Sequence, residues 1–344
     1  MATKTHSFHI PVMGIGFTID TPLKVSHFGI DSVISLIDDM LIEKLRKMYC
    51  GKHGLAYHEI TKETEDHRAK RITAYLDLLN TLAKEKFERL KTSLAEKSVE
   101  LRDYRAILPD GSGIKRHLNR MIHDNASFTD IKEWIMNNLS MGSIDVNIMT
   151  KVQRANYGKG GVLPVEYNDA LSALRGYANS GLNSSIIFSA GMNPALYGYM
   201  AKFDDFFPDK SGEIKKKIVL KVSDYRSALI QGKFLAGKGL WVSEYRIESG
   251  LNCGGHAFAS TGNLMGPILS EFRDRREELH QTVYERFLHG LSGMKRHIPH
   301  KRLPIKISAQ GGVGTAVEHR FLLDHYHVDS VGWGTPFLLV PEVT

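Results

Sequence analysis

Cysteine is scarce in this chain, and long apolar segments are absent. The two cysteines, Cys50 and Cys253, are too few and too far apart for a disulfide framework or a metal-ligand spacing, which agrees with a reducing compartment. No run of eighteen apolar residues exists to cross a membrane. The residues from Met1 to His6 also lack the apolar stretch of a secretory signal. We therefore expect a cytoplasmic protein without a membrane partner.

Motifs for binding nucleic acid or metal are missing as well. The net charge of +7 and the pI of about 9.1 would suit an anionic partner. However, the basic clusters at 215–217 and 295–302 have no interleaved aromatic residues and match no nucleic-acid motif. We therefore predict no nucleic-acid partner; a solvated surface or attraction of an anionic cofactor or substrate explains the charge. The histidines show no metal-ligand pattern, so no metal is predicted.

What is present is the composition and length of a large globular protein. Hydrophobic residues make up 42% of the chain and charged residues 24%, which is neither disordered nor membrane-like. A (β/α)₈ barrel needs about 250 residues. The 344 residues of this chain therefore leave room for an insertion or a second lobe.

Apolar runs of strand length alternate with helical patterns along the chain. Some runs include the turn that follows them, and they fall at 9–18, 32–37, 142–149, 185–191, 217–222, 241–248, 304–309 and 328–335. Regular alternation with strands that are apolar throughout predicts an α/β protein with a parallel sheet, and eight units predict closure into a (β/α)₈ TIM barrel. Few residues follow the eighth run, so the final barrel helix is expected to be missing. Either the chain is a fragment or another segment covers that gap.

The long stretch between the second and third runs has a different periodicity. Apolar residues recur at three- and four-residue spacing among charged residues, which is typical of long amphipathic helices. We predict three parts: a first part of the barrel at 1–50, a helical insertion at 51–135, and the rest of the barrel at 136–344. The insertion would pack on the barrel or form a lid; its apolar stripe is better explained by packing than by a partner, although it could support a homo-oligomer.

Glycine-rich turns follow the last two strands, as Gln310-Gly311-Gly312 and Gly332-Trp333-Gly334-Thr335. Glycine lets the backbone come close to a ligand, and successive N–H groups can bind one phosphate. The loops after strands 7 and 8 do this in many (β/α)₈ barrels. Ordinary turns between strand and helix also favour glycine, but two such turns in succession indicate a phosphate site.

Together with Gly254-Gly255-His256 after the sixth strand, these two turns resemble the nitronate monooxygenase (2-nitropropane dioxygenase) family. That family consists of FMN-dependent (β/α)₈ barrels similar to the flavin-dependent enoyl reductases. The resemblance extends in order to Pro11-Val12-Met13, Asn147, Gly191, Pro194 and Lys221, and it leaves out the helical insertion. Two departures are that Val12 separates Pro11 from Met13, and that Asn252-Cys253 stand where a Glu-Ala pair is common.

The resemblance implies FMN as cofactor and a role for each matching residue. Gly311, Gly312, Gly334 and Thr335 would hold the phosphate, and Asn147 and Lys221 would contact the flavin ring or the ribityl chain. The full set of cofactor-binding residues it implies is Met13, Gly14, Asn147, Lys221, Gly254, Gly255, Gln310, Gly311, Gly312, Gly334 and Thr335.

His256 would be the catalytic base facing the flavin. A histidine with a pKa near neutrality can remove a carbon-bound proton before electrons pass to the cofactor. A cation such as Lys221 beside the flavin would stabilise the anionic reduced ring. The alternatives to these roles are a structural His256 in a loop, and a Lys221 that either extends its charge to solvent or is paired.

Three functions are compatible with the sequence. The first is an FMN-dependent oxidoreductase, of the monooxygenase or dioxygenase kind, that oxidises a small acidic-carbon substrate. The second is a flavin reductase that uses NAD(P)H and resembles an enoyl reductase or the FMN domain of glutamate synthase. The third is a phosphate-ligand-binding barrel without its own chemistry.

Overall fold

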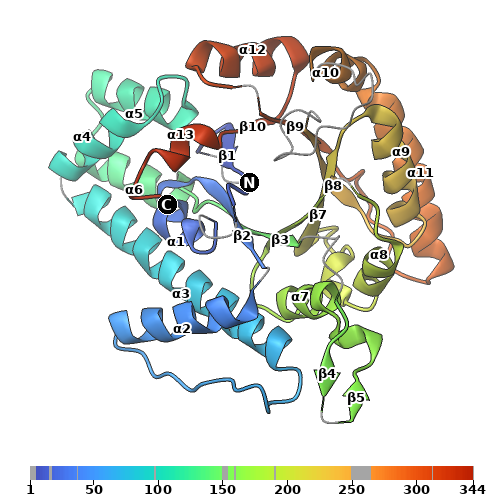
Figure 1. The fold of residues 1–344 in the computed structure, drawn as a ribbon. Helices are drawn as coiled ribbons and strands as arrows, with labels where there is room; N and C mark the ends of the chain where they lie inside the picture. Colours follow the sequence, from blue (N-terminus) through green and yellow to red (C-terminus); the bar gives the residue numbers. More distant parts are fainter. Residues whose placement is uncertain are drawn as a thin grey trace.

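The computed structural model describes residues 5–14, 18–36, 38–96, 98–148, 154–158, 160–189, 191–248, 265–311 and 313–343. Eight parallel strands close into a barrel in the order β1-β2-β3-β6-β7-β8-β9-β10, with β10 beside β1 (Figure 1). These strands are β1 (Phe8–Ile10), β2 (Asp31–Ser35), β3 (Ile144–Ile148), β6 (Ser184–Phe188), β7 (Lys216–Val222), β8 (Val242–Glu248), β9 (Lys306–Gln310) and β10 (Ser330–Gly332). The (β/α)₈ barrel predicted from the sequence is confirmed, and each predicted apolar run overlaps one barrel strand.

Helices surround the barrel because one face of each strand is apolar and must be covered. On β7, Ile218, Leu220 and Val222 are buried in the main core, which lies between the strands and the surrounding helices. The helices of this layer are α1 (Thr21–Val25), α2 (Asp39–Lys52), α3 (His67–Glu96), α7 (Asp169–Ala178), α8 (Pro194–Met200), α9 (Tyr225–Ala236), α10 (Met265–Asp274), α11 (Arg276–Gly293), α12 (Ala316–Tyr326) and α13 (Thr335–Leu338).

The helical region between β2 and β3 contributes to two separate cores. The first half of α3, including Leu76 and Leu79, is part of the main core of the barrel. Its second half, from Phe87 onward, packs with α4 (Ser98–Ile107), α5 (Gly113–His123) and α6 (Phe128–Asn138) around a second core. The domain boundaries given above remain a prediction, but the 30 residues of α3 physically connect the two cores.

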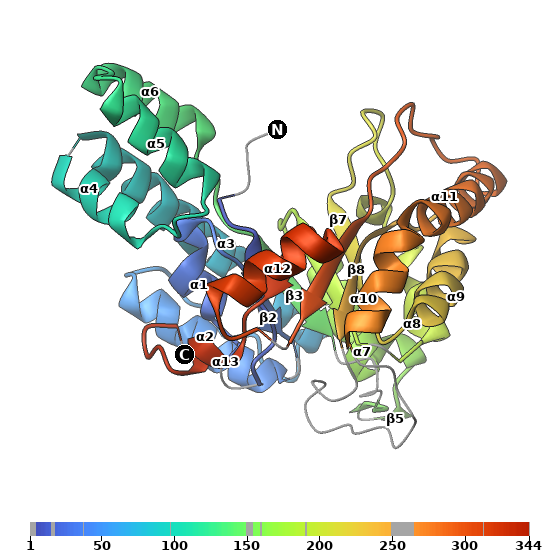
Figure 2. The ribbon, with the colours of Figure 1, turned by 90° about the horizontal axis from the view of Figure 1, so that it is seen from above.

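The second core lies at the end of the barrel where the strands begin. Phe28 and Met141, which shortly precede β2 and β3, pack against it. Figure 2 shows α4, α5 and α6 at one end of the molecule and β5 at the opposite end. Helices α4 to α6 are therefore not placed to cover the carboxyl ends of the strands, as a lid over that face would have to be.

Two small elements complete the described chain. The loop after β3 carries a hairpin of β4 (Tyr157–Gly158) and β5 (Gly161–Val162), where the sequence predicted only a glycine-rich loop. After β10, α13 has only four residues, and the chain beyond it packs on the outside of β1, where Val343 is buried with Ile10. None of the helices in the described ranges combines the length and apolar character that a membrane crossing needs.

Candidate site at the carboxyl ends of the strands

The inside of the barrel can be recognised from residues on strands that are not neighbours. Val33 of β2, Ile187 of β6 and Val219 of β7 form one small apolar cluster. Because β3 separates β2 from β6, the side chains of Val33 and Ile187 can meet only inside the barrel. Side chains alternate between the two faces of a strand, so Lys221 points inward like Val219. By the same alternation Asn147 also faces inward, because Val146 and Ile148 of β3 belong to the outer core.

Three polar residues from adjacent strands meet at the carboxyl end of this interior. The Nζ atom of Lys221 lies 3.2 Å from Oε1 of Glu248, and Nε2 of Gln310 donates a hydrogen bond to the same oxygen. Lys221, Glu248 and Gln310 lie near the ends of β7, β8 and β9. We call them the mouth triad. The pairing of Lys221 with an acid, one of the two alternatives for this lysine, is thus observed, and Glu248 was not predicted from the sequence.

Below the mouth triad, the barrel centre holds a second charged group. Arg246 lies 2.8 Å from Oε1 of Glu244, and Oγ of Ser308 donates a hydrogen bond of 2.5 Å to the same oxygen. Burial alone would raise the pKa of Glu244, but the charges of Arg246 and His9 and the hydrogen bonds from Ser308 and Arg246 lower the pKa to about 2. Glu244 is therefore a carboxylate at every physiological pH, and Arg246 does not stand as an isolated buried charge.

Asp145 of β3 is a further buried acidic residue inside the barrel. It accepts hydrogen bonds from Oγ of Ser143 and from the backbone N–H of Ser185. Burial and the nearby charge of Asp31 nevertheless raise its pKa above the ordinary value. The sequence contains a signal for this polar interior: Glu244, Arg246 and Glu248 alternate with apolar residues along one strand, although the run was interpreted as apolar throughout.

The glycine turns after β9 and β10 lie side by side, as predicted from their positions in a barrel. Gln310 is the register partner of Gly332, and Gly332 is the register partner of His9 on β1. Gly311 has φ of 101°, a left-handed backbone conformation that only glycine adopts easily. A Cβ on Gly334 would lie 3.6 Å from Cγ of Pro11, so the turn after β10 touches the segment after β1.

Near these turns, the backbone N–H groups at the start of α12 already bind a side chain of the protein. Thr315 and Glu318 form a capping box at the start of α12, and the Glu318 carboxylate accepts hydrogen bonds from the backbone N–H groups of Gly314 and Thr315. These bonds lower the pKa of Glu318. The amides of Gly334 and Thr335 have no such partner within the described ranges, so they are the better donors for a phosphate.

The other residues implied by the resemblance are placed as follows. Met13 packs against the outer apolar cluster of Ile10, Val25 and Val343, and the carbonyl of Gly14 accepts a hydrogen bond from the N–H of Thr18. Asn147 is buried near the end of β3. Gly254, Gly255, His256 and Gly312 lie outside the described residues.

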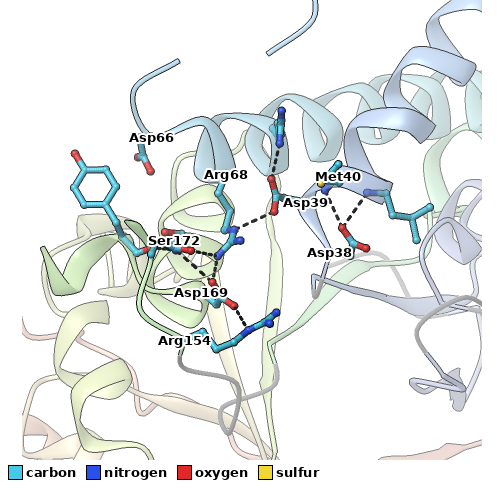
Figure 3. Close-up of polar contacts among 12 residues, drawn as sticks. Asp38, Asp39, Met40, Asp66, Arg68, Arg154, Asp169 and Ser172 are labelled. Atoms are coloured by element: carbon cyan, nitrogen blue, oxygen red, sulfur yellow. Dashed lines mark hydrogen bonds and ion pairs between the residues drawn. The ribbon is translucent and has the colours of Figure 1, made fainter. Parts of the chain in front are cut away.

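A separate ion-pair network stabilises the loops on the same face (Figure 3). Asp39, at the start of α2, pairs with Arg68 and Arg71 at 3.0 and 2.8 Å. Arg68 also pairs with Asp169 at the start of α7, and Asp169 in turn pairs with Arg154 beside the hairpin. Burial alone would raise the pKa of Asp39, but its two arginine partners lower it. The network joins the starts of α2, α3 and α7.

Neither the family models nor the curated proteins match this chain. The resemblance to nitronate monooxygenases therefore rests on the sequence motifs, of which Gly254, Gly255, His256 and Gly312 lie outside the described residues.

Proposed function

We propose that the protein is an FMN-dependent oxidoreductase resembling nitronate monooxygenase, which oxidises a small substrate with an acidic C–H bond. The proposal rests on two features that lie at the same end of a closed barrel. Side chains with hydrogen-bonding capacity lie at the mouth, and the adjacent glycine turns offer backbone amides. Active sites of (β/α)₈ barrels lie at this end.

The residues present suit FMN at both of its ends. Towards the ring, Asn147, Lys221 and Gln310 offer donors and acceptors that a flavin can use. Towards the phosphate, the amides of Gly334 and Thr335 are available, whereas Glu318 competes for those at the start of α12. We therefore assign the phosphate to the turn after β10 together with Gly311.

Bound FMN would supply the acceptor for the electrons that leave the substrate. The chain itself would bind the cofactor, shield it from water, and move a proton. By the resemblance, His256 takes the proton from the substrate carbon. Lys221 keeps a positive charge at the mouth, and its pairing with Glu248 fixes the position of that charge.

The reaction class is tested by mixing the FMN-loaded protein with a small alkyl nitronate in the absence of oxygen. We expect the flavin absorbance to bleach, and His256→Ala to slow this bleaching by at least about a hundredfold, the scale of general base catalysis. Unchanged bleaching in His256→Ala would remove the proposed base. Rapid bleaching by NAD(P)H, with none by the nitronate, would favour the flavin reductase instead.

The phosphate assignment gives a separate prediction about binding. Thr335→Glu places a carboxylate beside the amides of the turn after β10, where it repels a phosphate, so FMN should bind at least about tenfold more weakly, or about 1.4 kcal/mol. The matched control is Leu339→Glu, which adds the same charge at a side chain that is 81% exposed on the same segment. Fluorescence titration measures both. Equal affinities in the two variants would refute the assignment.

A further inference from the structure

Glu248 connects two side chains that the proposed FMN site uses. Lys221 and Gln310 both bind its Oε1 atom, so the Lys221 ammonium and the Gln310 amide must lie close together. Glu248 itself is only 4% exposed, while the side chain of Lys221 is 18% exposed. The carboxylate is therefore more deeply buried than the lysine side chain that it binds.

Lys221 and Gln310 can each form further hydrogen bonds on the side that faces away from Glu248. A lysine ammonium has three N–H donors, and Glu248 is its only partner among the described residues. The amide nitrogen of Gln310 donates to Glu248, so the amide carbonyl points away from the carboxylate. That carbonyl oxygen accepts no hydrogen bond within the described ranges. Donors from Lys221 and an acceptor from Gln310 thus stand side by side.

Gly332 makes room for this arrangement. A Cβ at this position would lie 3.0 Å from Cγ of Gln310, closer than nearly all real contacts of a Cβ. The glycine therefore leaves room beside β10 for the first carbons of the Gln310 side chain, whose amide reaches Glu248 on β8. The hydrogen bond to Glu248 then orients the amide.

We infer that Glu248 is a positioning residue that makes the mouth triad selective for a cyclic imide edge, meaning an adjacent ring C=O and N–H. Lys221 donates to the ring carbonyl, and the carbonyl of Gln310 accepts from the ring N–H. The pyrimidine end of a flavin carries this pattern at C2=O and N3–H. The inference rests on the proposed function for the identity of the ring, and it adds which edge is recognised and which residue fixes the recognition.

The reason for selectivity is the fixed direction of the amide. A glutamine side chain without Glu248 can rotate its amide by half a turn and offer N–H in place of C=O. With Glu248 accepting from the amide nitrogen, only the carbonyl oxygen faces the ligand. A ligand that lacks the N–H then leaves a buried acceptor unpaired, and the loss of a hydrogen bond in such a site is costly.

The test compares the affinity of FMN with that of FMN methylated at N3, by fluorescence titration of the full chain. The wild-type protein should bind FMN at least about tenfold more tightly than the methylated form. Gln310→Leu removes the acceptor and should reduce this ratio to near unity. Glu248→Gln should reduce the ratio as well, because it no longer fixes the direction of the Gln310 amide or holds the Lys221 charge.

Glu271→Gln is the matched control, since it removes a carboxylate paired with Arg275 at 2.7 Å on the outer helix α10. It should leave both affinities unchanged. Thermal unfolding of each variant checks the fold, and Gln310→Leu alone decides the question if Glu248→Gln does not fold. If wild type binds FMN and the methylated form equally, the inference fails and the proposed function stands. If FMN is not bound at all, both fail.

Discussion

At the scale of single residues, the barrel interior contains charged side chains, and ion pairing offsets the cost of burying them. A buried charge without a partner costs several kcal/mol, whereas a buried pair with good geometry can offset its desolvation. Arg246 is paired with Glu244, and Lys221 with Glu248. Removal of one member leaves the other as an uncompensated charge. The consequence for experiments is that Glu244 and Arg246 are poor choices for testing function, because their loss would disturb folding first.

Lys216 is a buried charge of a different kind, since it has no carboxylate within ion-pair distance among the described residues. Its Nζ atom donates to the carbonyl and hydroxyl of Ser180 and lies over the ring of Tyr177. Burial, together with the charge of Lys215, lowers the pKa of Lys216 to about 7. In the unfolded chain its pKa is about 10.4. The folded state therefore binds fewer protons between these two values.

This difference predicts a pH dependence of stability. Because the unfolded state binds more protons between about pH 7 and pH 10, the free energy of unfolding should rise with pH in this window, by up to about 1.4 kcal/mol per pH unit. This added stability should disappear as the pH falls towards 7. Lys216→Met should flatten the rise, and the exposed Lys210→Met should keep it. Urea unfolding at several pH values measures this; identical slopes in wild type and Lys216→Met would contradict it.

At the scale of elements, the sequence predicted the barrel strands but not what their polar residues do together. Runs such as 217–222 are apolar enough to stand out, and their alternation with helices allowed few topologies. The pairing of Lys221 with Glu248 joins residues of different strands, and strand order alone does not tell which inward side chains meet. The hairpin was missed because β4 and β5 have two residues each, too few for a periodicity.

The division of the long helical region between two cores could not be predicted from the sequence either. The apolar stripe of α3 is continuous, so nothing in its spacing marks the point near Phe87 where it leaves one core and enters the other. Only the partner elements, α4 to α6, reveal that the second half of α3 belongs to a separate core.

The roles implied for His256, Gly254, Gly255 and Gly312 stay predictions, because these residues lie outside the described ranges.

The two cores predict a separable effect of mutation. Leu118 of α5 is fully buried in the second core, so Leu118→Ala should destabilise α4 to α6 by about 2–5 kcal/mol. Ile122→Ala, on the same helix at a side chain that is 41% exposed, should have a small effect. Hydrogen exchange followed by mass spectrometry should show lost protection in α4 to α6 and retained protection in β7 and β8. Equal loss in the barrel strands would show that the cores are not separable.

At the scale of the whole molecule, closure of the barrel is what assembles the site. His9 of β1 and Gly332 of β10 come from opposite ends of the chain and are register partners, so the segment after β1 meets the turns after β9 and β10. Helices α4 to α6 lie at the other end of the barrel and so do not cover the mouth. The proposed cofactor site thus depends on the barrel and not on the second core.

The most direct test of this account is a titration of the purified wild-type protein with FMN, followed by flavin fluorescence and visible absorbance. We predict saturable binding of a single FMN per chain, with a perturbed flavin spectrum and a rise in unfolding temperature. Binding should persist in Leu118→Ala, because the second core is remote from the mouth. A colourless protein that takes up no FMN and shows no thermal shift would contradict the central claim.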